Sequence, residues 1–311
     1  MNTQRNSISL TLGIGALLLA LTPGARAAAP APETVKLRTL SLGIVSEIPP
    51  QQIEEHFRDF ARYVARKLSS TSDIEGKVVV APTALQLAKL LEQKKVDFYL
   101  ESPYPTYLIN RQGAAQLLLR RWKSGMAVYH SILFTQRGSG ATRLEELRGK
   151  MIAFEDPGST SGYFLPKVLL LRKGFKLSEK SSLQAKVAPK EVGYIFTRSD
   201  RKIVDLVLSK QVAAGAISDD DYKTIDEKKR ADIAILAETE ALPRHLLSIR
   251  KDLPAAAANR LKEILLAMGQ DEEGRRILAK TDNTTKFDVL PGGEESVRRK
   301  FVEVFRSHDK N

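Results

Sequence analysis

Apolar positions along the first third of the chain alternate between two spacings, one typical of strands and one of helices. Short apolar runs predict strands, and stretches with apolar residues three to four positions apart predict helices that bury one face. The expected order is strand 37–45, helix 51–68, strand 77–81, helix 83–94 and strand 96–100. Strands that alternate with helices predict a parallel sheet with right-handed crossovers.

The same alternation starts again after a strand-like run at residues 126–136 and a short helix at 144–150. The expected elements are strand 151–154, helix 163–173, strand 192–196, helix 200–210, strand 212–217, a helix that opens near Asp219, and strands 233–237 and 246–249. Helices at 254–268, 271–280 and 294–306 end the chain, and no fixed-period repeat is present. The pattern predicts an α/β protein, and 311 residues suffice for two domains.

The most informative stretch is residues 152–166, which reads I-A-F-E-D-P-G-S-T-S-G-Y-F-L-P. A strand runs into a tight turn and then into a helix, whose first backbone N–H groups have no partner inside the helix. Ser159, Thr160 and Ser161 add three hydroxyls at this positive helix end, which predicts an anion site. The alternative is that a serine or threonine only caps the helix. Three hydroxyls followed by Gly162 are more than a cap needs.

The first 27 residues are expected to be a secretory signal peptide. Arg5 precedes a Leu-rich apolar stretch, and a Pro-Gly break leads to Ala25-Arg26-Ala27, where cleavage is expected. An uncleaved membrane anchor is the alternative. The chain has no cysteine, so disulfides, thiolate metal sites and cysteine nucleophiles are excluded. These features favour an exported protein of the periplasm.

The chain is strongly basic. Its formal charge is +12, and loss of Arg5 and Arg26 with the signal peptide lowers it to +10. Such a balance suits an anionic ligand or surface. Nucleic acid is not expected as a partner, because basic residues are spread along the chain and aromatic residues make up only 6% of it.

Three segments resemble a known family in their order and spacing: V-D-F-Y-L-E-S-P-Y-P-T-Y at 96–107, L-R-G-K-M-I-A-F-E-D-P-G-S-T-S-G-Y-F-L-P at 147–166, and V-A-A-G-A-I-S-D-D-D at 212–221. They resemble the phosphate/phosphite/phosphonate substrate-binding proteins of ABC transporters, the PhnD-like group. The similarity extends over nearly all of the chain after residue 27, and S-T-S-G-Y-x-x-P is its most specific part.

The resemblance implies a type II periplasmic binding protein fold. Two α/β lobes, expected at 28–130 plus 246–311 and at 131–245, would be joined by two hinge strands near 128–133 and 242–248. The ligand would lie in the cleft between the lobes, which would close by rotation about the hinges. No cofactor is implied.

The resemblance also implies that the S-T-S segment holds the phosphoryl oxygens, with Tyr104 reaching from the opposite lobe. The expected ligand-binding residues are Ser102, Tyr104, Ser159, Thr160, Ser161, Gly162, Ser199, Asp219 and Arg244. Glu47 and Glu101 lie at the expected mouth of the cleft. They would either accept a proton from the ligand or simply be solvated, and solvation is favoured.

Two departures from the family bear on the ligand. Relatives often carry a Ser-His pair where this chain has Thr197-Arg198-Ser199-Asp200, so a histidine donor is missing. Near the second hinge, Arg244 and His245 stand where some relatives have an acid that receives an amine. We therefore expect an anionic ligand without a compensating amine, with Arg244 as a partner. The alternative for Arg244 is a surface position at a domain edge.

The sequence is compatible with a binding protein of either of two kinds and argues against an enzyme. A monomeric binding protein that delivers an oxyanion to an ABC permease is favoured, and a module that presents its ligand to a membrane sensor protein is the alternative. An enzyme is not expected, because no motif ties one of the four histidines to Ser159 or Ser161. Three acids at 219–221 suggest helix capping rather than a metal site. Aromatic residues such as Tyr99, Tyr129 and Trp122 are expected in the core.

Overall fold

The computed structural model describes residue 1, residues 37–69 and residues 73–306. The described residues other than Met1 belong to the larger of two units, Thr34–Asn311. The expected signal peptide therefore lies outside the described residues, apart from Met1. Within the described residues, no helix combines the length and the apolar character needed to cross a membrane.

The first sheet of the larger unit has the strand order β14-β4-β13-β3-β1-β2. Its strands are β1 (Thr39–Val45), β2 (Glu75–Ala81), β3 (Phe98–Glu101), β4 (Ala115–Lys123), β13 (His245–Arg250) and β14 (Thr284–Asp288). Strand β1 pairs in parallel with β2 and β3, as the sequence predicts. The sheet as a whole is mixed, however, because β13, β4 and β14 join it in antiparallel register.

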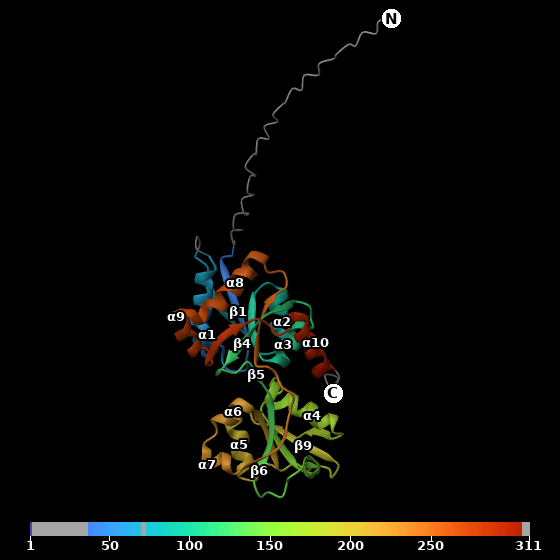
Figure 1. Cartoon of the computed structure of the whole chain (residues 1–311). Helices are drawn as coiled ribbons and strands as arrows, with labels where there is room; N and C mark the ends of the chain where they lie inside the picture. Colours follow the sequence, from blue (N-terminus) through green and yellow to red (C-terminus); the bar gives the residue numbers. More distant parts are fainter. Residues whose placement is uncertain (2–36, 70–72, 307–311) are drawn as a thin grey trace. The chain divides into compact units, whose positions relative to one another are not determined.

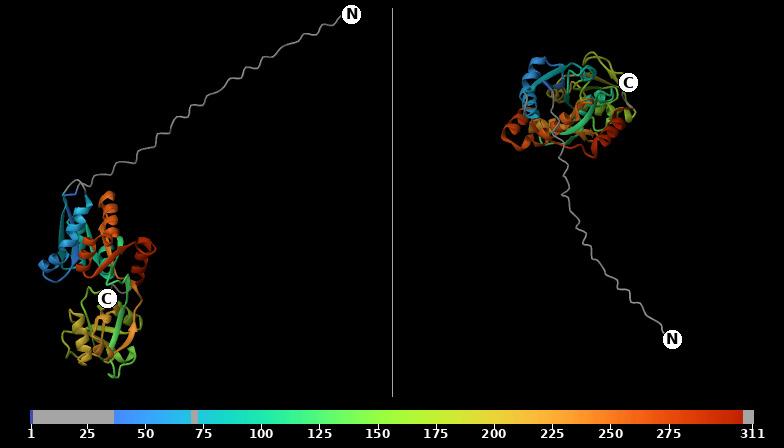
Figure 2. Two further views of the ribbon diagram at one scale, coloured as in Figure 1. Left: turned by 60° about the vertical axis from the view of Figure 1, so that its left-hand side comes forward. Right: turned by 90° about the horizontal axis from the view of Figure 1, so that it is seen from above.

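Helices from both ends of the chain accompany this sheet. They are α1 (Pro50–Leu68), α2 (Ala84–Glu92), α3 (Pro103–Asn110), α8 (Ala255–Ala267), the short η3 (Met268–Gln270), α9 (Glu272–Lys280) and α10 (Gly293–Phe305). Helix α1 contacts α8 and α9, so segments about 200 positions apart lie side by side (Figures 1 and 2). One core cluster joins them, with Phe60 of α1, Phe98 of β3 and Leu261 of α8 completely buried.

The second sheet has the order β11-β6-β10-β7-β9-β8. Its strands are β6 (Ser131–Gln136), β7 (Met151–Phe154), β8 (Lys176–Glu179), β9 (Glu191–Phe196), β10 (Ala214–Ser218) and β11 (Ile233–Glu238). Its helices are η1 (Leu144–Leu147), η2 (Thr160–Phe164), α4 (Leu165–Arg172), α5 (Asp200–Leu208), α6 (Asp219–Thr224) and α7 (Glu227–Ala231). Strands β8, β9, β7 and β10 are parallel, so the loops after β7, β9 and β10 meet at one edge of the sheet.

A two-stranded ribbon lies where the chain passes between the two sheets. Strand β5 (Val128–Tyr129) pairs with β12 (Leu242–Pro243) in antiparallel register. The first crossing runs from β4 through β5 into β6, and the return runs from β11 through β12 into β13. Both crossings coincide with the segments expected as hinges. The strand-like run at 126–136 is interrupted at His130, where the chain leaves the ribbon and enters β6.

The strand pairing brings distant polar segments together at one edge of the first sheet, where β4 ends and β13 begins. Leu246 lies opposite Glu101, and His245 lies opposite Arg121. The start of β13 therefore neighbours the end of β3 and the end of β4. This edge carries Ser102 and Tyr104 on the segment that follows β3.

Candidate functional site

Ser159 and the helix that follows it form the structural centre of the predicted anion site. The Ser159 hydroxyl accepts a hydrogen bond from the Gly162 N–H at 2.9 Å, so Ser159 caps the helix. The first turn, Thr160–Phe164, is a π-helix that continues into α4. The N–H groups of Thr160 and Ser161 make no hydrogen bond to another described residue. The capping interpretation and the anion interpretation are thus compatible, because Ser159 caps while two N–H groups remain.

Gly162 is required here by close approach. A Cβ at this position would lie 2.6 Å from both Cβ and Oε2 of Glu155, and 2.9 Å from the Ser159 hydroxyl. The Glu155 N–H also donates to the Gly162 carbonyl at 3.0 Å. The turn therefore folds back on the end of β7, which holds the helix start in place.

Thr160 touches the start of a helix that belongs to the other sheet. Its hydroxyl accepts a hydrogen bond from the Tyr104 N–H at 2.9 Å and lies 3.0 Å from the Ser102 hydroxyl. Ser102 is the N-cap residue of α3 and Tyr104 is in its first turn. Thr160 is only 1% exposed. The first turns of two helices, one from each sheet, thus meet at this side chain.

Apolar contacts surround the same place. The Tyr104 ring stacks on Phe164 with ring centroids 3.8 Å apart, and both rings contact Phe305 of α10. These side chains belong to a buried cluster that also contains Tyr129 of the ribbon. Tyr104 therefore reaches the S-T-S segment as expected, but its ring packs against apolar side chains, and its backbone N–H is the group that contacts Thr160.

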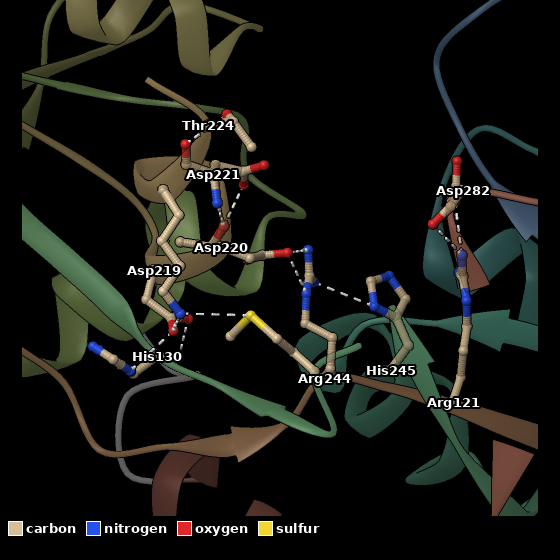
Figure 3. Close-up of polar contacts among 12 residues, drawn as sticks. Arg121, His130, Asp219, Asp220, Asp221, Thr224, Arg244, His245 and Asp282 are labelled. Atoms are coloured by element: carbon tan, nitrogen blue, oxygen red, sulfur yellow. Dashed lines mark hydrogen bonds and ion pairs between the residues drawn. The ribbon is translucent and has the colours of Figure 1, made fainter. Parts of the chain in front are cut away.

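Arg244 lies beside this junction and is 5% exposed. Its Nε and Nη2 donate to the same oxygen of Asp220, Oδ2, at 2.9 and 2.8 Å, and its Nη1 lies 3.2 Å from Nδ1 of His245 (Figure 3). The guanidinium also lies over the Tyr129 ring, 4.3 Å from its centroid. The alternative of a surface position at a domain edge was wrong, because the return of the chain into β13 buries this residue.

The electrostatics of the second sheet's edge are set by crowded carboxylates. Burial raises the pKa of Asp200 to about 8, and Glu155 and Asp221 add to the rise. Burial also raises the pKa of Asp220, but the Arg244 guanidinium and neighbouring donors outweigh it and hold that pKa below its usual value. Lys123, at the end of β4, lowers the pKa of both groups. Asp220 is therefore ionised, with Arg244 as its partner.

Two other predicted residues make contacts that have a structural role. Ser199 caps α5 by accepting from the Lys202 N–H at 3.4 Å. Asp219 accepts from the His130 N–H at 3.2 Å and from Lys223 at 3.2 Å (Figure 3). No three His, Cys, Asp or Glu residues within the described ranges are grouped so that they could hold a metal. A ligand role for Ser199 and Asp219 stays a prediction.

Glu101 differs from the favoured expectation of a solvated carboxylate. The Val45 N–H donates to its Oε1 at 2.6 Å. Burial raises the pKa of Glu101 to about 8, against the lowering effect of this bond. Glu47, in contrast, is exposed and pairs with Arg198 from the loop after β9. The aromatic expectation is correct for Tyr99 and Tyr129, which are almost completely buried.

Sequence reasoning missed Asp220, Tyr129 and Lys123 as members of the site. Asp220 belongs to the acidic run 219–221, which is interpreted from the sequence as helix capping, and Tyr129 is expected to be a core residue. Lys123 belongs to β4, a strand whose charged residues conceal its alternation of exposed and buried positions. Adjacency of these residues to Arg244 depends on the antiparallel pairing of β4, β13 and the ribbon.

Comparison with known proteins assigns the chain to a family. A family model described as ABC transporter, phosphonate, periplasmic substrate-binding protein matches residues 42–290. The chain belongs to this family, whose members bind substrates for transporters rather than act as enzymes. The resemblance recognised in the sequence and the periplasmic binding fold are both confirmed.

Solved structures agree with this assignment. XAC2383 from Xanthomonas citri, solved bound to ATP, is 27% identical over 86% of this chain and 95% of its own, with a TM-score of 0.77. The same protein bound to chloride gives 26% identity, 88% and 100% coverage, and a TM-score of 0.81. PhnD1 from Prochlorococcus marinus, in complex with methylphosphonate, is 16% identical over 88% of this chain and 99% of its own, with a TM-score of 0.66, and shares the fold.

Proposed function

We propose that this protein captures a phosphate-like oxyanion, such as phosphate, phosphite, a phosphonate or a small phosphate ester, and delivers it to an ABC permease. The observation that carries the proposal is the meeting of two helix starts at Thr160, one on each sheet. Both starts are positive ends of helix dipoles. An anion placed between the two helix starts offsets the repulsion between their positive ends and accepts hydrogen bonds from their N–H groups.

The two sheets are proposed to act as the lobes expected from the sequence, 28–130 plus 246–311 and 131–245, with the β5–β12 ribbon as the hinge. In this proposal, the N–H groups of Thr160 and Ser161 and the hydroxyls of the S-T-S segment bind the ligand from one lobe. Ser102 and the Tyr104 N–H, which contact the Thr160 hydroxyl in this structure, exchange that contact for the ligand and bind it from the other lobe. Arg244 lies alongside and supplies positive charge.

The gain and cost of binding are compatible with a scavenging protein. Four or five hydrogen bonds to a charged oxyanion contribute about 1.5 to 3 kcal/mol each. Ordering of the ligand and closure of the lobes cost several kcal/mol. A net of roughly 8 kcal/mol corresponds to micromolar binding.

The class of ligand is supported by the family and by its relatives. The family model is one of phosphonate binding, and the Xanthomonas relative holds ATP, whose phosphoryl groups present the same oxygens. The ammonium group of an aminophosphonate needs a carboxylate whose charge is not already balanced, but the charge of Asp220 is balanced by Arg244. This favours a ligand without an amine.

The test is a thermal-shift and calorimetry panel on the protein purified from the periplasm. Phosphate, phosphite, methylphosphonate, aminoethylphosphonate, a small phosphate ester and ATP are compared, on the wild type and on Thr160→Val. A ligand that binds only the folded state raises the melting temperature by mass action, by roughly 2.7 kcal/mol of stability at a hundredfold excess over Kd. We expect one phosphoryl ligand to stabilise the wild type and to bind the variant at least tenfold more weakly. If none of the panel binds, the oxyanion function is wrong.

A further inference from the structure

Two buried polar atoms beside Arg244 have no hydrogen-bond partner among the described residues. They are Oδ1 of Asp220 and the hydroxyl of Tyr129. Asp220 is 7% exposed and Tyr129 is 1% exposed. The two contacts between Arg244 and Asp220 both use Oδ2 of Asp220, so Oδ1 remains available as an acceptor. Buried polar atoms without partners are uncommon and call for a functional explanation.

Contacts connect both side chains to the proposed ligand position: Tyr129 shares a buried cluster with Phe164, and Arg244 lies over the Tyr129 ring and pairs with Asp220. The Thr160 side chain lies near enough to the Tyr129 hydroxyl to lower its pKa as a hydrogen-bonding neighbour, but the two make no hydrogen bond of normal geometry. Arg244 and Asp220 also act on this pKa. Burial raises that pKa to about 12, so the hydroxyl keeps its proton and acts as a donor. Asp220 is ionised because Arg244 pairs with it, so its free oxygen can only accept. One donor and one acceptor are therefore held together in a buried place.

We propose that Asp220 and Tyr129 select a tetrahedral oxyanion that still carries a proton. The ligand O–H would donate to Oδ1 of Asp220, and the Tyr129 hydroxyl would donate to a second ligand oxygen. A sulfonate or sulfate has no proton to donate. It would instead place an anionic oxygen against an ionised carboxylate, which is repulsive in a buried site.

This inference deepens the proposed function and rests on it. It predicts discrimination between ligands of equal charge and nearly equal shape. Singly protonated methylphosphonate and methanesulfonate are such a pair, because both are monoanions and differ in the acidic proton. A site built around a hydrogen bond rejects an analogue that cannot make it, because the buried group is then left unpaired.

The experiment is calorimetric titration of both ligands in a mildly acidic buffer that keeps methylphosphonate singly protonated. The wild type should prefer methylphosphonate by at least about 100-fold. Asp220→Asn should reduce the preference below about tenfold, because its amide can donate to a sulfonate oxygen. Tyr129→Phe should weaken both ligands by a similar factor and keep the preference. Asp205→Asn, at an exposed carboxylate paired with Lys229, is the matched control and should match the wild type.

Loss of Asp220 leaves Arg244 unpaired, which is destabilising in a buried place. The double variant with Asp220→Asn and Arg244→Gln removes both charges, and it should also lose the preference if the carboxylate selects the ligand. A wild-type preference below tenfold, or a preference that survives in both Asp220 variants, would overturn the selection by Asp220 while oxyanion binding stands. Binding of neither ligand by the wild type would overturn the selection by Asp220, whereas the oxyanion function itself fails only if none of the wider ligand panel binds.

Discussion

Phe164 packs the helix that starts at Thr160 against helices of the other sheet. It follows β7 of the second sheet, but its ring contacts Tyr104 of α3, at 3.8 Å between centroids, and Phe305 of α10, at 5.2 Å. Phe164 is 1% exposed. Opening of the two lobes would have to break both aromatic contacts. Phe164→Ala therefore tests whether these contacts hold the lobes together.

The size of the effect follows from the contacts. Phe→Ala in a core costs about 3 to 5 kcal/mol of stability, which lowers Tm by roughly 10 °C in a protein of this size. Each aromatic pair contributes about 0.5 to 1.5 kcal/mol beyond its buried area. Loss of two pairs removes about 1 to 3 kcal/mol from the closed form, so the ratio of closed to open molecules falls by a factor of roughly 5 to 150.

The assay is small-angle X-ray scattering without ligand, with Tm measured on the same samples. The matched control is Phe154→Ala, since Phe154 is completely buried within the second sheet's own core. Both variants should lose comparable stability, but only Phe164→Ala should increase the radius of gyration. Equal radii for the two variants would refute the idea that Phe164 fastens the lobes.

Three further predictions concern single positions. Gly162→Ala should lower the free energy of unfolding by about 1 to 3 kcal/mol and abolish ligand binding, because its Cβ would lie 2.6 Å from Glu155. Gly269→Ala is the control: its Cβ would be 3.6 Å from the nearest atom, so it should be tolerated in the same unfolding and binding assays. Asp200→Asn should raise Tm more at about pH 8 than at about pH 4. The raised pKa of Asp200 makes wild-type stability fall as pH rises from its unfolded value, near 4, to about 8, and the amide removes this loss. Arg121→Ala should lower the free energy of unfolding by about 3 to 5 kcal/mol, because this 1% exposed guanidinium pairs with Asp282 and holds the segment before β14. An unchanged midpoint of denaturant unfolding would contradict that role.

Much of the fold could be predicted because local pattern and final structure agree. The turn after β7 is one case, since a strand, a turn and hydroxyl residues predict a helix start within fifteen positions; the helix begins at Thr160, three positions before the expected 163, because its first turn is a π-helix. Strand β7 and helix α5 begin where the sequence predicts. The signals are local here, because a cap, a turn glycine and an apolar run act on the same few residues.

What could not be predicted depends on pairings between distant segments. Strand β4 has charged residues among its apolar ones, and Arg121 is buried because Thr284 and the Thr281 carbonyl, some 160 positions away, receive its donors. Contacts of Arg244 with Asp220 and Tyr129 likewise require the ribbon of β5 and β12. No local pattern encodes such contacts, so the sequence alone does not place Asp220 and Tyr129 beside Arg244.

The central claim is that an oxyanion binds where the two helix starts meet. A crystal structure of the protein with arsenate, an isostere of phosphate with a strong anomalous signal, tests it most directly. We expect the anomalous peak of arsenic at a position where the arsenate oxygens accept hydrogen bonds from the N–H groups of Thr160 and Ser161. The Tyr104 N–H should lie close to the same arsenate. Ordered arsenate elsewhere, for example in the cavity of about 360 Å³ beside Lys150 and Lys210, with none at the helix starts, would contradict the account.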